Sequence, residues 1–120
     1  MQSQLGGGDA ANIRRSVLPL SVLLALESGP SYAYELARRL RGVHDLVSAE
    51  NDLYGCLKRL RSRGFLAFEW KESAKGPPQK LYRLTEKGLD HLAVLIEVWG
   101  ELRAALLQMR HVGTNDAARP

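Results

Sequence analysis

The chain has 120 residues and a formal net charge of +4 at pH 7, which suits one domain and permits nucleic-acid binding without proving it. No apolar run approaches the roughly 20 residues that a membrane-spanning helix needs, so neither a transmembrane helix nor a membrane partner is expected. The single cysteine, Cys56, excludes an intrachain disulfide and fits a reducing cytoplasm, where we expect the protein to reside.

The N-terminal part is predicted to be a disordered tail followed by one apolar helix. Residues 1–12 are polar and glycine-rich, and they lack the basic and apolar regions of a signal peptide. The helix is expected from about Ile13 to Leu26, and its nearly all-round apolar surface predicts burial against its own domain and a partner. Pro19 lacks a backbone donor, so the first helical turn is its best place.

Two shorter helices are predicted next. Ser31 is a candidate N-cap for a helix over residues 32–41, which Gly42 ends. A further helix is expected from about Ser48, another candidate N-cap, to Gly64. Its buried stripe is formed by leucines at i, i+4 and i+7, namely Leu53, Leu57 and Leu60. The rest of this helix is polar and cationic, and the pair is typical of a helix-turn-helix.

A β-hairpin is predicted after the second of these helices. The strands are expected over Phe65–Trp70 and Leu81–Leu84, with Gly76-Pro77-Pro78 forming the tip because proline cannot join a ladder interior. Residues 31–83 hold eleven cations against six anions, an excess of five that is larger than the excess of the whole chain. The positive charge therefore gathers in the region of these helices and this hairpin.

The last helix is predicted to join two chains. Thr85 is a candidate cap, and Gly88 costs a little helix propensity. Apolar residues then follow with gaps of three and four, at Leu92, Leu95, Trp99, Leu102, Leu106 and Met109. This coiled-coil-like seam indicates a helix that covers its own domain and meets a second chain.

The predicted fold class is mostly α with a small β-hairpin (α+β), a winged helix-turn-helix followed by a dimerisation helix. The expected organisation is a tail at 1–12, a DNA-binding domain at 13–85, a dimerisation helix at 86–112 and a second disordered tail at 113–120.

Several short stretches, in order, resemble the PadR family of transcriptional regulators. They are Leu24-Ala-Leu with Gly29-Pro, Tyr34-Glu-Leu-Ala, Leu53-Tyr54 with Leu57-Lys-Arg-Leu and Gly64, Trp70, Leu81-Tyr-Arg-Leu-Thr-Glu-Lys-Gly88, and Trp99. The short last helix is similar to that of the small, multidrug-sensing subgroup. The resemblance implies a homodimer that binds a pseudo-palindromic operator, usually represses, and leaves the DNA when an effector binds.

Two positions depart from the family pattern. Asp52 stands where threonine is common before Leu-Tyr, and Gly55 stands where proline is common after it. An unpaired aspartate beside DNA repels phosphate, although an acid in the first helical turn also favours the helix. These departures leave open an alternative, a winged-helix protein-interaction module that has lost specific DNA reading.

The candidate DNA-binding residues lie on the cationic helix, at the hairpin and on the preceding helix. A major groove admits one α-helix, whose polar side chains read base edges, while cations neutralise phosphates. Under the resemblance, the double-stranded DNA contacts are Tyr34, Asn51, Tyr54, Lys58, Arg59, Arg61, Lys75 and Lys80.

In the small multidrug-sensing members a tryptophan of the last helix lines a cavity at the dimer interface, and Trp99 matches it. Packing between helices is the alternative for this side chain. An indole at a two-fold interface suits a planar aromatic or cationic effector. The candidate effector and dimer-interface residues are Val17, Leu20, Leu92, Leu95, Ile96, Trp99, Leu102, Arg103 and Leu106, with Glu101 as a further lining residue.

No catalytic constellation, cofactor motif or metal site stands out, so an enzyme is not expected. His44, His91 and His111 are isolated, without the spacing of a zinc site. Cys56 is interpreted as a small half-buried apolar residue. The alternative, a redox switch, requires a thiolate stabilised by Lys58 or Arg59.

Overall fold

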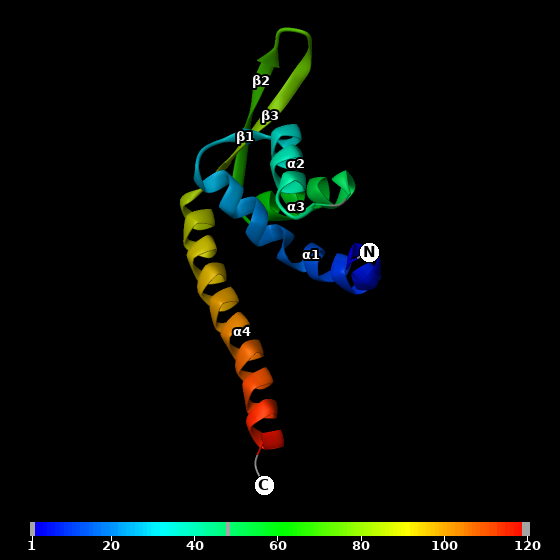
Figure 1. Ribbon diagram of the computed structural model, residues 1–120. Helices are drawn as coiled ribbons and strands as arrows, with labels where there is room; N and C mark the ends of the chain where they lie inside the picture. Colours follow the sequence, from blue (N-terminus) through cyan, green and yellow to red (C-terminus); the bar gives the residue numbers. More distant parts are fainter. Residues whose placement is uncertain (1, 48, 119–120) are drawn as a thin grey trace.

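The computed structural model describes the backbone at residues 2–47 and 49–118, and the side chains at 7–47 and 49–111. This part of the chain forms four helices and a three-stranded antiparallel sheet (Figure 1), which confirms the predicted fold class. The elements in chain order are α1 (Gln2–Glu27), β1 (Ser31–Tyr32), α2 (Ala33–Gly42), α3 (Glu50–Ser62), β2 (Leu66–Ser73), β3 (Gly76–Leu84) and α4 (Glu86–Ala118).

The first helix starts earlier than the sequence indicated. It begins at Gln2 instead of near Ile13, with one non-helical residue at Gly7 (φ 41°, ψ −129°). Pro19 therefore lies inside α1 and not in its first turn. Proline removes one helical hydrogen bond, and packing compensates, since α1 contacts α2, α3 and α4.

The caps of α2 and α3 differ from the predicted serines. Ser31 belongs to β1, which pairs with β3, and Tyr32 is the N-cap residue of α2. Ser31 instead supports the turn through Glu35, whose carboxylate accepts from the Tyr32 backbone N–H at 3.0 Å and from the Ser31 hydroxyl at 3.3 Å. The N-cap residue of α3 is Ala49, and Ser48 lies outside the described residues.

The hairpin is longer than predicted, and its tip is elsewhere. Pro77 and Pro78 lie within β3, while Ala74 and Lys75 form the turn. The register shifts between Lys71 and Ser73, opposite these prolines. The pairing of β3 with β1 is confined to Leu81 and Tyr82, so the outer part of β3 has an open edge. Proline is tolerated there because no ladder partner needs its missing N–H.

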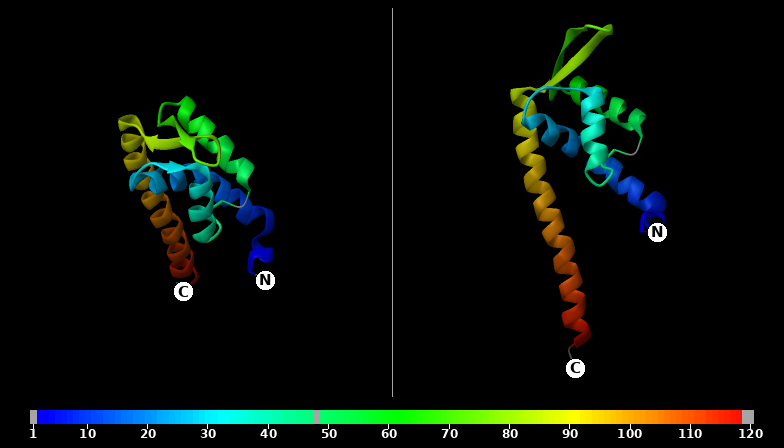
Figure 2. Two further views of the ribbon diagram at one scale, coloured as in Figure 1. Left: turned by 90° about the horizontal axis from the view of Figure 1, so that it is seen from above. Right: turned by 45° about the horizontal axis from the view of Figure 1, so that its top comes forward.

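One core holds the winged helix together. The predicted stripe of α3 is confirmed, since Leu53, Leu57 and Leu60 are buried among apolar side chains of α1, α2 and β2. From α4 this core receives Leu92, with Leu95 partly buried beside it. The C-terminal part of α4 extends away from the other elements (Figure 2), and the molecule has extents of 71 × 35 × 21 Å. Among the described residues, no helix combines the length and apolar character needed to cross a membrane.

Candidate nucleic-acid interface

The outer face of α3 is exposed, polar and cationic. The apolar stripe of this helix faces the core, which turns the remaining positions outward. Tyr54 is 50% exposed, and the other predicted DNA-binding residues of the helix are also exposed. These are Asn51, Lys58, Arg59 and Arg61. The helix thus presents hydrogen-bonding and cationic groups along one face, as groove recognition requires.

The acids at the start of α3 are paired with arginines. Asp52 Oδ2 lies 3.6 Å from Arg15 Nε on α1, and Glu50 Oε1 lies 3.3 Å from Arg41 Nη2 on α2. Both carboxylates also lie in the first turn, where negative charge is favourable to the helix. The negative charge of Asp52 is therefore compensated by Arg15, which weakens the argument that this residue repels DNA.

A cluster of aromatic rings joins α3 to the hairpin. The Arg61 guanidinium lies 4.5 Å from the centre of the Phe68 ring on β2. Lys80 on β3 places its ammonium 4.7 Å from the same ring and 5.5 Å from that of Trp70. Phe68 meets Trp70 edge to face at 5.7 Å and Tyr82 at 5.6 Å. Two predicted DNA-binding cations are thereby held at the junction of helix and hairpin.

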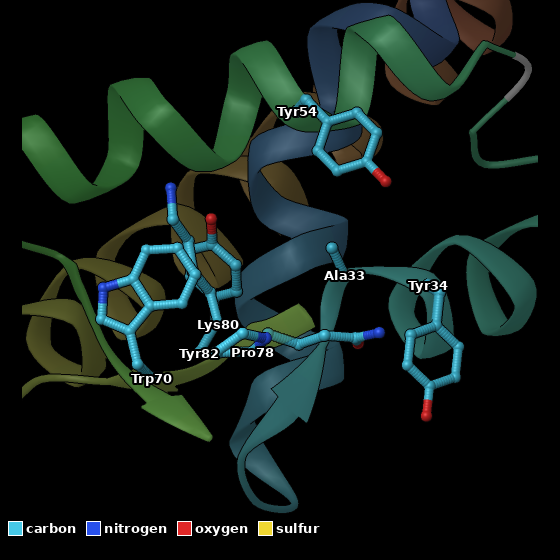
Figure 3. Close-up of a pocket in the computed structure, with 8 residues that line it drawn as sticks. Ala33, Tyr34, Tyr54, Trp70, Pro78, Lys80 and Tyr82 are labelled. Atoms are coloured by element: carbon cyan, nitrogen blue, oxygen red, sulfur yellow. The ribbon is translucent and has the colours of Figure 1, made fainter. Parts of the chain in front are cut away.

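An open hollow of about 360 Å³ lies between α2, α3 and the hairpin. Figure 3 shows Tyr54 projecting from α3 toward this space, with Lys80 beside the Trp70 indole. Tyr34 borders it from α2 and is 54% exposed. Burial raises the pKa of Tyr82, which keeps its phenol protonated, although Arg61 lowers that pKa in part. The lining residues are Ala33, Tyr34, Tyr54, Trp70, Pro78, Gln79, Lys80 and Tyr82.

Three of the predicted DNA-binding residues meet in this hollow, namely Tyr34, Tyr54 and Lys80. Lys75 is exposed at the hairpin turn, apart from it. Sequence reasoning assigned no site role to Trp70 or Gln79. The alternation of Phe68 and Trp70 along one strand was the available signal, because residues two apart share a face.

A second candidate region surrounds Trp99, which is 46% exposed. An open hollow of about 570 Å³ lies on one side, bordered by α1 and by His44 and Leu46. Another of about 410 Å³ includes Arg63, His91, Leu95 and Leu102 in its lining. Val17, Leu20 and Trp99 border both hollows, so the structure brings these three predicted residues together.

Other predicted interface residues have different surroundings. Leu92 is only 2% exposed and packs within the chain's own core, so it does not lie on the surface that a partner chain would contact. Ile96, Arg103 and Leu106 are exposed on α4 but line neither hollow beside Trp99. Glu101 is also exposed.

Cys56 is fully buried instead of half-buried, with 1% of its surface exposed. Burial raises the pKa of its thiol to about 11, and Arg59 opposes this shift only in part. The thiol form is thus favoured, which argues against the redox alternative. No group of three or more His, Cys, Asp or Glu that could hold a metal ion occurs among the described residues.

Comparison with known proteins places these features in a family. The model of the transcriptional regulator PadR-like family matches residues 22–94, which is more than half of the chain. A PadR-like transcription factor of Bacteroides fragilis is 34% identical, with a TM-score of 0.71, over 83% of this chain and 96% of that one. A PadR family regulator of Eggerthella lenta is 30% identical, with a TM-score of 0.79, over 90% and 94%.

One structural relative was solved with DNA. Bacillus subtilis PadR in complex with operator DNA is 26% identical, with a TM-score of 0.61, over 67% of this chain and 46% of that one. A search of curated proteins gives no match. The family match over residues 22–94 and the near-complete coverage of two relatives at 30% identity or more agree with the resemblance seen in the sequence. This chain therefore belongs to the PadR-like family of transcriptional regulators.

Proposed function

We propose that this protein is a dimeric DNA-binding transcriptional regulator, a repressor that a small-molecule effector releases from a pseudo-palindromic operator. The observation that carries the proposal is the shared surface of α2, α3 and the hairpin. On it Tyr54, Lys58 and Arg61 are exposed on α3, with Tyr34 and Lys80 beside them. Support comes from the operator complex of Bacillus subtilis PadR, which has the same fold over the part that matches this chain.

The proposed dimer rests on the apolar surface of α4. Apolar side chains stay exposed along the predicted seam, including Trp99 (46%), Leu102 (55%) and Leu106 (67%). Exposed apolar side chains that recur at this spacing along one helix face are typical of a helix that pairs with another. Two-fold pairing through α4 would present two copies of α3 to one duplex, which suits a palindromic operator.

The proposed effector site is the region around Trp99. Its two hollows are lined mainly by apolar side chains, which suits the body of a planar aromatic ligand. Titration with planar aromatic or cationic compounds should quench Trp99 fluorescence in a Trp70→Phe variant, in which Trp99 is the remaining indole. A protein–DNA complex should dissociate over the same concentration range. Quenching without dissociation would contradict effector release.

The proposed DNA binding is tested with two labelled duplexes, one from the promoter beside the gene and one of random sequence. Affinity for both should fall steeply with salt, because cations displace counterions from phosphates. Lys58→Ala should weaken both complexes by a similar factor. Arg14→Ala removes the same charge on α1, beside Leu46 and Val47, and should change affinity much less. Tight binding that barely depends on salt would contradict the proposal.

The alternative of an interaction module without DNA reading is tested at Asp52. Replacement by threonine removes the partner of Arg15 and frees a cation beside α3. A DNA-binding protein should respond with an altered affinity for the promoter duplex. An interaction module should show no difference in DNA binding between the two forms.

A further inference from the structure

We infer that the hollow between α2, α3 and the hairpin seats one sugar–phosphate unit of the DNA backbone, with Trp70 against the sugar and Lys80 against the phosphate. The inference rests on the proposed DNA-binding function and deepens it. It assigns a role to Trp70, which lies on the hairpin and not on the helix that reads the groove.

The chemistry of the hollow suits an anion with an apolar part. Four aromatic side chains border it, and Trp70 is 61% exposed although it is the largest of them. Lys80 supplies one positive charge, and none of the eight lining residues is acidic. A concave surface that gathers several aromatic side chains and a few polar groups is typical of a binding site.

Among the side chains that the structure describes, aromatic rings and not a carboxylate hold the ammonium of Lys80. It lies over the rings of Phe68 and Trp70, and no carboxylate lies within ion-pair distance of it in the part of the chain that the structure describes. Ring faces attract a cation without neutralising it. Lys71 on the neighbouring strand differs, because its ammonium lies 3.2 Å from Glu69.

The lining groups suit the DNA backbone better than a base edge. Base edges are read mainly by bidentate Arg, Asn or Gln side chains. The hollow contains no guanidinium and one amide, that of Gln79. An ammonium and tyrosine hydroxyls are donors that bind phosphate oxygens, and an indole face packs well against deoxyribose carbons. The contact should therefore contribute to affinity without contributing to sequence preference.

The direct test uses Trp70 as its own probe. The chain has two tryptophans, so Trp99→Phe leaves Trp70 as the remaining indole. A random duplex at low salt, labelled for anisotropy, should change the Trp70 emission in parallel with binding. The matched variant Trp70→Phe reports on Trp99, which does not line this hollow, so its emission should change less with the same duplex.

The salt dependence of binding separates the phosphate contact of Lys80 from the sugar contact of Trp70. Lys80→Ala should reduce the slope of log affinity against log salt by about 0.9 for each chain of the dimer that contacts the duplex, because each chain loses one phosphate contact. Trp70→Leu should weaken the random and promoter duplexes by the same severalfold factor and leave the slope unchanged. Lys71→Ala, which removes a paired cation outside the hollow, should leave the slope unchanged.

The outcomes distinguish this inference from the proposed function. If the wild type binds DNA while Trp70 emission stays constant and Trp70→Leu binds normally, the sugar–phosphate seat is wrong and the proposed function stands. If the wild type binds neither duplex, both fail. A loss for the promoter duplex alone in Trp70→Leu would also overturn the inference, because it would assign Trp70 to base reading.

Discussion

Gly88 occupies a position where the fold leaves no room for a side chain. A Cβ built at this position would overlap the Phe65 carbonyl oxygen and lie 3.0 Å from its carbon, so the backbone would have to shift. We expect Gly88→Ala to lower the free energy of unfolding by about 1–3 kcal/mol, the usual cost of overpacking, in urea denaturation.

The control for Gly88 is another glycine of the same helix. A Cβ built at Gly100 would meet no neighbouring atom of the described residues within 4 Å. Gly100→Ala should therefore leave stability unchanged or raise it by up to ~1 kcal/mol through helix propensity. Equal effects of the two substitutions would show that close approach is not what requires Gly88.

His91 makes stability depend on pH. Its ring stacks on Phe65 at 3.9 Å, and burial, followed by Arg63 and Lys87, lowers its pKa from the ordinary 6.5. The unfolded chain therefore takes up this proton more readily than the folded chain. Its contribution to stability is complete above about pH 6.5 and is lost as the pH falls through the lowered folded pKa.

Thermal unfolding across pH 5–8 is the measurement, in about half-unit steps. The melting temperature should fall on the acidic side, and His91→Phe should flatten this part of the curve while keeping an aromatic ring against Phe65. His44, an exposed histidine, supplies the control His44→Gln, which should keep the wild-type dependence. If the melting temperature of His91→Phe still fell at acidic pH as it does in the wild type, His91 would not be the group responsible.

Residue patterns predicted burial better than they predicted pairing. The leucine stripe of α3 follows directly from helical periodicity, and it is buried as expected. The pairing of Asp52 with Arg15 joins positions far apart in the sequence, so no local pattern indicates it. The same holds for Phe68, whose contacts with Arg61 and Lys80 come from helix and hairpin packing together.

At the scale of elements, Thr85 links the end of α3 to the start of α4. Its hydroxyl donates to the Gly64 carbonyl at 2.6 Å and accepts from the Gly88 N–H at 3.0 Å, which confirms the predicted cap. Thr85→Val keeps the shape but removes both hydrogen bonds. We expect a loss of about 1–2 kcal/mol in the free energy of unfolding.

Circular dichroism during urea unfolding measures the Thr85→Val loss, and Thr85→Ser is its matched control. Serine keeps the hydroxyl and loses one methyl group, so it should retain most of the stability. A serine variant as unstable as the valine variant would assign the effect of Thr85 to its methyl group instead of its hydrogen bonds.

The hairpin shows where element prediction from sequence reaches its limit. The two apolar runs predicted two strands, but the prolines led us to place the tip at Gly76-Pro77-Pro78. Whether a strand tolerates proline depends on its neighbours, and here β3 has β1 beside it only at Leu81 and Tyr82. The short strand β1 was missed for a similar reason, since its two residues pair with a distant partner.

At the scale of the molecule, α4 is a helix that the single chain leaves largely uncovered. Its first turns are fixed by Thr85 and Leu92, whereas the positions from Ile96 to His111 are exposed. The seam of gaps three and four predicted this apolar face, and the sequence could not tell which members turn inward. Leu92 does so because it lies where α4 still contacts the core.

The proposed dimer gives a prediction at Leu102, a seam residue that is 55% exposed in the single chain. Leu102→Glu would place like charges at a two-fold interface and remove apolar contact, so analytical ultracentrifugation should show monomers. Ala104, two positions along the helix, faces away from the seam, and Ala104→Glu adds the same charge there and should remain dimeric. Because one chain contacts only half of a palindromic site, Leu102→Glu should also weaken promoter binding far more than Ala104→Glu. Dimers in both variants would show that another surface joins the chains.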